Sequence, residues 1–244
     1  MPPRLIALLC VRAALGATPL YRDPTASIAE RADDLLARMT TDEKIAQTWA
    51  PYGSFDGAAA IGARFNGTGV GQLSYLAAGA GDPSTMAAAR NAVQRAILDG
   101  SRLGIPASFS QEALHSAGTG ATVFPESVTL GSSWDVALVE DVSAAIAREA
   151  RALGVDVAFA PVINLWADAR FGRLQEGYSE NPALTAAYAA AAARGFQGRR
   201  PAGADADGGW FYLGRDKLVA LAKARARVFA RESARERTRR RGSA

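Results

Sequence analysis

The chain has 244 residues, of which 49% are hydrophobic and 21% charged, so its length and composition suit one folded α/β domain and exclude global disorder. The chain has a net charge of +4. Residues 223–244 carry one lysine and eight arginines against two glutamates, which gives +7, so the body of the chain before them has −3 and is mildly acidic. A single cysteine, Cys10, and a single histidine, His115, exclude a disulfide bond, a multi-histidine zinc site and any histidine catalysis that does not use His115. We therefore expect hydrolytic chemistry to depend on carboxylates.

Residues 1–17 resemble a secretory signal peptide. Arg4 precedes an apolar run from Leu5 to Val11, and Gly16 and Ala17 are small residues of the kind found before a cleavage site. This pattern predicts a periplasmic or secreted protein; the alternative is a poorly ordered terminus of a cytoplasmic one. No segment reaches the roughly 20 apolar residues of a membrane-spanning helix, so no membrane span is predicted.

Two capping boxes predict short helices after this segment. Ser27 and Glu30 have the spacing of the first box, and Thr40 and Glu43 have that of the second. The second helix is expected to end before Pro51. The Gly- and Ala-rich stretch that follows, to residue 69, predicts a loop with about one helical turn.

The rest of the body alternates between predicted strands and predicted helices. The strands are expected at 70–76, 107–110, 155–160 and 218–222, and the helices at 83–98, from Asp135 to Gly154, and at 182–196. This order is typical of parallel strands joined by helices, as in a doubly wound sheet or a β/α barrel. No glycine-rich phosphate loop follows a strand. About four of the eight units of a closed barrel can be counted.

Polar residues follow these strands, where parallel α/β proteins bind ligands. They are Glu112 and His115 after the second strand, Asn164, Asp168, Arg170, Arg173 and Glu176 after the third, and Lys223 after the fourth. Carboxylate, guanidinium and ammonium groups together can hold the hydroxyls of a sugar. Two alternatives remain: Asp168, Arg170 and Glu176 pair with one another to order their loop, and His115 is a core or supporting residue instead of a catalytic base.

Four motif-bearing segments occur in a recognisable order. They run from Tyr21-Arg-Asp-Pro24 to Gln47, from Leu103-Gly-Ile-Pro106 to Ala121-Thr-Val-Phe-Pro125, from Trp134-Asp135 to Phe159-Ala-Pro161, and from Arg170-Phe-Gly-Arg173 to Arg194-Gly-Phe-Gln-Gly198. Together they resemble the amino-terminal domain of glycoside hydrolase family 3. The resemblance implies a (β/α)8 TIM-type barrel of which about half is present, over residues 18–222, and it implies no cofactor and no metal. Residues 223–244 form an Arg-rich tail outside the family pattern.

The resemblance also implies roles for three residues. Glu112 stands where the family has a carboxylate that holds sugar hydroxyls, and Arg173 stands where it has a sugar-binding arginine. Lys223 resembles the lysine of a Lys-His sugar-binding pair. Ala224 stands in place of that histidine, and the family pattern is lost after it, as a frame change or an early end would produce.

No catalytic residue is identified. The family mechanism is retaining and uses two carboxyl groups about 5–5.5 Å apart. The nucleophile would lie beyond the end of the pattern, so Asp205, Asp207 and Asp216, which precede Lys223, are not candidates. We predict a hydrolase of β-glucosidase or β-xylosidase type that acts on oligosaccharides or on aryl or alkyl β-glycosides, with the nucleophile and the acid/base absent from this chain.

Two alternatives stay open. The chain could be an inactive sugar-binding fragment, whose open barrel edges would favour aggregation or assembly with a complementing half. Less favoured, the basic tail at 223–244 could bind nucleic acid or an anionic surface, although runs of like charge are more often solvated. No nucleic-acid partner is expected for the body of the chain.

Overall fold

The computed structural model describes residues 18–51, 57–75, 82–118, 120–166, 168–199 and 213–224. The chain divides into two compact units, and the break between them falls between Gln47 and Thr48. The predicted signal peptide at 1–17 lies outside the described residues, as does the tail from residue 225 onward. None of the described helices is long and apolar enough to cross a membrane.

The described part of the first unit consists of short capped helices. They are the 3-10 turn η1 (Leu20–Arg22) and the helices α2 (Ile28–Arg38) and α3 (Thr41–Gln47). The hydroxyl of Ser27 accepts the backbone N–H of Glu30, and the carboxylate of Glu30 accepts the backbone N–H of Ser27. Thr40 and Glu43 exchange the same two hydrogen bonds. Both predicted capping boxes are therefore confirmed.

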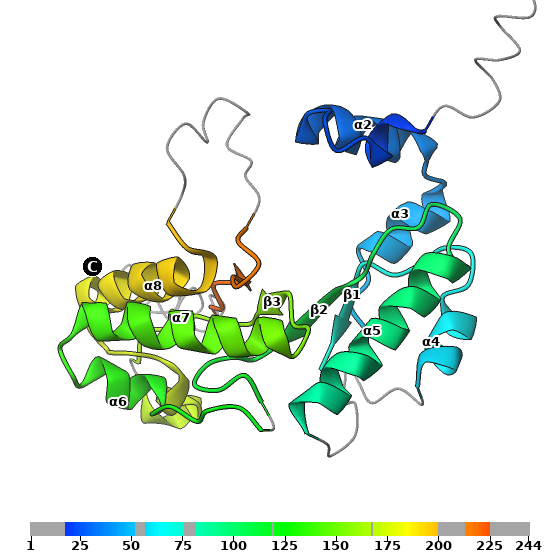
Figure 1. The fold of residues 1–244 in the computed structure, drawn as a ribbon. Helices are drawn as coiled ribbons and strands as arrows, with labels where there is room; N and C mark the ends of the chain where they lie inside the picture. Colours follow the sequence, from blue (N-terminus) through cyan, green and yellow to red (C-terminus); the bar gives the residue numbers. More distant parts are fainter. Residues whose placement is uncertain are drawn as a thin grey trace, which may run out of the picture. The chain divides into compact units, whose positions relative to one another are not determined.

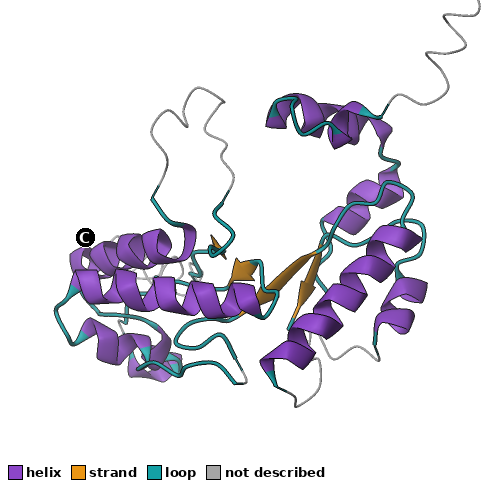
Figure 2. Cartoon of the chain, in the orientation of Figure 1, coloured by secondary structure: helices purple, strands orange, loops and turns teal. Residues whose placement is uncertain are grey.

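A parallel sheet forms the centre of the second unit. Its strands are β1 (Gln72–Ser74), β2 (Ser108–Gln111), β3 (Val157–Ala158) and β4 (Val219–Ala220), shown in orange in Figure 2. The strands are parallel and lie in the order β1-β2-β3-β4. A doubly wound sheet reverses its strand order at a switch point, whereas a barrel adds each strand beside the last. The order is therefore that of successive barrel strands.

A further extended segment covers the outer edge of β1. The carbonyl oxygens of Trp49 and Pro51 accept hydrogen bonds from the backbone N–H groups of Gln72 and Ser74, at 3.2 and 3.1 Å. Because both partners advance by two residues, this segment runs parallel to β1. It therefore acts as a further barrel strand before β1, in addition to the four strands that the sequence predicts.

In the described residues of the second unit, five α-helices accompany the strands. They are α4 (Ala58–Arg64), α5 (Pro83–Gly100), α6 (Ser127–Gly131), α7 (Val136–Ala152) and α8 (Pro182–Gln197). The three long helices, α5, α7 and α8, begin at the side-chain caps Asp82, Asp135 and Asn181, and their predicted positions are confirmed. The five-residue helix α6 was not predicted.

Helix α4 corrects the prediction of a loop with about one helical turn. The segment forms a seven-residue helix that buries Ile61 and packs along α5. A Cβ atom on Gly62 would lie only 3.2 Å from the Cβ of Ala96 in α5. The small residues in this stretch therefore allow two helices to approach closely, although in the sequence they read as loop formers.

Two hydrophobic clusters hold the helices against the sheet. One joins α4 and α5 to β1 and β2 around Leu73, Ile97 and Phe109. The other joins α6, α7 and α8 to β3 and β4 and includes Ile146 and Phe196. Helices α7 and α8 pack side by side, as Figure 1 shows in green and yellow.

Strands β1, β3 and β4 are shorter than predicted, whereas β2 has its predicted four residues. Pro161 follows β3 and has no N–H to donate, which interrupts the ladder. Pairing then resumes: the N–H of Lys223 donates to the carbonyl of Pro161 at 2.8 Å, and the N–H of Ile163 donates to the carbonyl of Lys223 at 2.9 Å. Lys223 is therefore held against the chain that follows β3, at the carboxyl end of the sheet.

Candidate functional site

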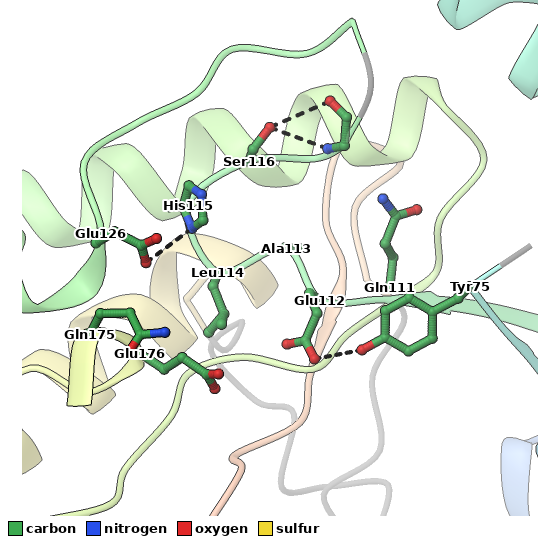
Figure 3. Close-up of a pocket in the computed structure, with 11 residues that line it drawn as sticks. Tyr75, Gln111, Glu112, Ala113, Leu114, His115, Ser116, Glu126, Gln175 and Glu176 are labelled. Carbon is green, nitrogen blue, oxygen red and sulfur yellow. Dashed lines mark hydrogen bonds and ion pairs between the residues drawn. The ribbon is translucent and has the colours of Figure 1, made fainter. Parts of the chain in front are cut away.

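Side chains that follow β1, β2 and β4 meet at the carboxyl end of the sheet. The ammonium group of Lys223 donates to Oε2 of Glu112 at 2.7 Å, although 111 residues separate the two. The hydroxyl of Tyr75 donates to Oε1 of the same carboxylate at 2.5 Å, as Figure 3 shows. Because the carboxyl ends of parallel strands share one edge, the sequence could place Glu112 and Lys223 together.

Arg173 joins this group through Glu176. Its guanidinium donates from Nε and Nη2 to the two oxygens of Glu176, at 2.5 and 2.6 Å. The carboxylate of Glu176 also lies 3.5 Å from Nζ of Lys223. The structure therefore brings Glu112, Arg173 and Lys223 into one cluster, with Glu176 as the link; their assignment as sugar-binding residues stays a prediction.

The electrostatics of the cluster balance. Burial pushes the pKa of Glu176 up, but the hydrogen bond from Arg173 and the charge of Lys223 outweigh it and hold the pKa below its usual range. The same hydrogen bond raises the pKa of Arg173, against the smaller effect of desolvation. The formal charges of Glu112, Glu176, Arg173 and Lys223 cancel. A cluster of this kind suits a neutral polar ligand better than a strongly charged one.

A pocket of about 350 Å³ borders the two carboxylates. It is lined by Tyr75, Gln111, Glu112, Ala113, Leu114, His115, Ser116, Gly118, Glu126, Gln175 and Glu176, most of them labelled in Figure 3. The volume lies at the lower end of the range for small-molecule sites, about 300–1,000 Å³, which suits a single sugar ring. Arg173 and Lys223 contact the carboxylates of the pocket without lining it. Nowhere in the described part of the chain do three or more metal-ligating groups come together.

His115 lies on the wall of this pocket. Its side chain is 33% exposed, and Nδ1 is 3.4 Å from Oε2 of Glu126, without the geometry of a hydrogen bond. The histidine is thus neither enclosed in the core nor held as a base beside a nucleophile. A supporting role for His115 stays a prediction.

Asp168 and Arg170 pair with each other, as the loop-ordering alternative predicts. Nε of Arg170 donates to both oxygens of Asp168, at 2.9 and 2.8 Å, and its backbone N–H donates at 2.9 Å. These hydrogen bonds lower the pKa of Asp168 to about 2. Asn164, Asp168 and Arg170 do not line the pocket. Of the polar residues predicted in this loop, only Arg173 and Glu176 join the cluster.

Tyr75 is a site residue that the sequence did not reveal, and the pocket-lining residues Gln111, Glu126 and Gln175 were not predicted either. Tyr75 falls inside the predicted strand at 70–76, but β1 ends at Ser74, and Tyr75 adopts a left-handed backbone with φ of 53°. Ala113, which follows Glu112, has the same φ. Left-handed backbone is uncommon outside glycine, and such residues cluster at functional sites. No motif in the sequence marks either position.

The family model described as the glycosyl hydrolase family 3 N terminal domain matches residues 40–211. The chain belongs to glycosyl hydrolase family 3. Its match includes the segments that carry Glu112, Arg173 and Glu176, and it ends before Lys223.

Relatives within family 3 are longer than this chain. A β-xylosidase of Formosa agariphila is 39% identical over 104 residues, which cover 40% of this chain and 14% of that protein. The β-glucosidase C of Emericella nidulans is 31% identical over 196 residues, which cover 75% of this chain and 32% of that protein. The chain thus spans about a third or less of the length of these family 3 relatives.

A solved structure supports the same assignment. A β-glucosidase from Erythrobacter marinus superposes with a TM-score of 0.71 at 30% identity, over 85% of this chain and 27% of that one. Together with the order of the four strands, this likeness confirms the predicted fold, a partial (β/α)8 barrel of the family 3 type.

Proposed function

We propose that this chain supplies the sugar-binding part of a β-glycosidase site that acts on terminal β-linked glucose or xylose. Glu112, Arg173 and Lys223 hold the terminal sugar. The observation that carries the proposal is the ion-paired cluster of these residues beside the pocket at the carboxyl end of the sheet. Membership of family 3 and the β-glucosidase and β-xylosidase relatives support it.

The cluster keeps hydrogen-bonding capacity for hydroxyl groups. Within the described part of the chain, each oxygen of Glu112 accepts one hydrogen bond, and a carboxylate offers about four acceptor positions in all. Arg173 uses two of its guanidinium N–H groups on Glu176, and a guanidinium carries about five. A sugar presents vicinal hydroxyls that both donate and accept, so it can use both kinds of group.

Hydrolysis with retention requires a nucleophile and an acid/base, with carboxyl groups about 5–5.5 Å apart. Glu112 and Glu176 are poor candidates, because each is hydrogen-bonded to a cation that lowers its reactivity as a nucleophile or a proton donor. We therefore assign neither catalytic role to the residues that the structure describes, and we propose that these two carboxylates bind the substrate.

A second candidate function is sugar binding without hydrolysis. It is favoured by the same observation, since Glu112 and Glu176 are engaged in ion pairs. The two functions differ in turnover: an aryl β-glucoside or β-xyloside would be cleaved by a hydrolase and only bound by the alternative.

The test is the binding of methyl β-D-glucoside and methyl β-D-xyloside to the whole chain, measured by titration calorimetry. Glu112→Gln removes the charge that Lys223 and the sugar share, so we expect the affinity to fall at least about tenfold, in line with about 1.5–3 kcal/mol for a hydrogen bond to a charged group. Asp168→Asn is the matched control, because Asp168 pairs with its neighbour Arg170 and does not line the pocket, so this change should leave the affinity unchanged. Equal affinities for Glu112→Gln and the unaltered chain would contradict the proposal.

A further inference from the structure

Tyr75 reaches Glu112 through an unusual backbone conformation. The side chains of Ser74 and Ser110 share one face of the sheet, where their hydroxyls lie 3.0 Å apart. Glu112 follows Ser110 by two residues, so it continues on that face. In a regular strand, Tyr75 would instead point to the opposite face with Leu73, which is buried against the helices. The left-handed turn at Tyr75 directs its hydroxyl to Glu112.

This conformation is held by the surrounding structure. A left-handed backbone is unfavourable for a residue with a side chain, so it persists only where other contacts hold it. The backbone N–H of Tyr75 donates to the carbonyl of Ser110 at 3.0 Å, and its ring packs against that of Phe159 with the centroids 5.7 Å apart. Contacts with Ser110 of β2 and with Phe159, which follows β3, therefore fix the backbone and the ring of Tyr75. Together they fix the position of its hydroxyl.

The hydrogen bond from Tyr75 restricts the orientation of the Glu112 carboxylate. Tyr75 holds Oε1 from the end of β1, and Lys223 holds Oε2 from the end of β4. A glutamate side chain that rotates freely loses conformational entropy when it binds a ligand. A glutamate held by two donors has already lost this entropy on folding, so ligand binding does not have to offset this loss. With both oxygens anchored, the acceptor positions that remain have fixed directions.

We propose that Tyr75 is a positioning residue that holds the Glu112 carboxylate in the orientation that binds a sugar. This inference rests on the proposed function, since it requires Glu112 to contact the ligand. Tyr75 acts through Glu112 and not through the stability of the fold. Removal of its hydroxyl should therefore weaken sugar binding only where Glu112 is intact.

The experiment compares Tyr75→Phe with the unaltered chain in the binding of methyl β-D-xyloside and methyl β-D-glucoside. Tyr75→Phe keeps the ring and its packing on Phe159, so we expect the dissociation constant to rise about five- to tenfold, with the thermal unfolding midpoint unchanged. Tyr188→Phe is the matched control. It removes a buried hydroxyl that donates to the carbonyl of Gly131 at 3.0 Å, so it should lower the unfolding midpoint and leave the dissociation constant unchanged.

A double-mutant cycle separates a positioning role from a structural one. In the Glu112→Gln background, the further change Tyr75→Phe should raise the dissociation constant by less than about twofold, because the group it positions has been altered. Two outcomes overturn the role of Tyr75 and leave the proposed function standing. In one, Tyr75→Phe weakens binding equally in both backgrounds. In the other, Glu112→Gln weakens binding but Tyr75→Phe has no effect. Binding that does not depend on Glu112, or no binding at all, overturns the proposed function and the role of Tyr75 with it.

Discussion

Two groups of charged side chains in the second unit are arranged in opposite ways. At the carboxyl end of the sheet, Glu112 and Lys223 lie beside a pocket. At the end of α7, by contrast, the charges are engaged by groups of the fold itself: Asp156 accepts the backbone N–H of Phe109 at 2.9 Å with one oxygen and pairs with Arg151 through the other. The second group completes the fold, whereas the first retains capacity for a ligand.

Arg90 shows the enclosed arrangement in its strongest form. It is 2% exposed, and it donates to the carbonyl of Leu153 at 2.5 Å and to the side chain of Gln111 at 2.9 Å. Burial lowers its pKa, against the smaller opposing effect of Asp156. An arginine stays charged even so, because its ordinary pKa is far above neutral. The comparison teaches that charge alone does not mark a site; what matters is whether its donors and acceptors are already used.

The largest effect on the free energy of unfolding should come from a change at the buried Arg90. Arg90→Met keeps much of the packing but leaves the acceptors on Leu153 and Gln111 without their donor, so we expect a loss of about 2–4 kcal/mol in the free energy of unfolding. Urea denaturation of the purified chain measures it, and a loss below about 1 kcal/mol would show that water replaces the guanidinium. Sugar affinity should not change in the fraction that stays folded.

A change at the pocket should show the reverse pattern. Lys223→Met removes the cation that Glu112 and Glu176 share, so we expect sugar affinity to fall about tenfold while the free energy of unfolding changes by less than about 1 kcal/mol. The side chain of Lys223 is only partly buried, which limits its effect on stability. A large loss of stability with unchanged affinity would assign Lys223 to the structural group.

The smallest expected effect is the pH dependence contributed by Glu176. Its pKa is lower in the folded chain than the ordinary value of 4.5, so the unfolded chain binds the proton more tightly. The stability that this group contributes is therefore present above about pH 4.5 and is lost as the pH falls through the folded pKa. Denaturation at a series of acid pH values should give a steeper decline for the unaltered chain than for Glu176→Gln. Identical slopes would contradict the ion pairs with Arg173 and Lys223.

Several features of this chain could be predicted because they depend on neighbours in the sequence. The caps at Ser27, Thr40 and Asp135 act within three residues, so their spacing is enough to locate the helix starts. The meeting of Glu112 and Lys223 spans 111 residues, yet it also follows from the sequence. Once strands alternate with helices, their carboxyl ends must share one edge of the sheet.

Other features were decided only by tertiary contacts. In the sequence Asp168 and Glu176 look alike, and each pairs with an arginine of its own loop, but Glu176 also lies 3.5 Å from Lys223, which comes from the end of the sheet. The composition of α4 predicts a loop, because the sequence does not show that its small residues pack against another helix. The sequence predicts Tyr75 to be a strand residue, but its hydrogen bond to Ser110 of β2 holds it in a left-handed turn. In each case several conformations are locally allowed, and long-range packing supplies the free energy that selects one.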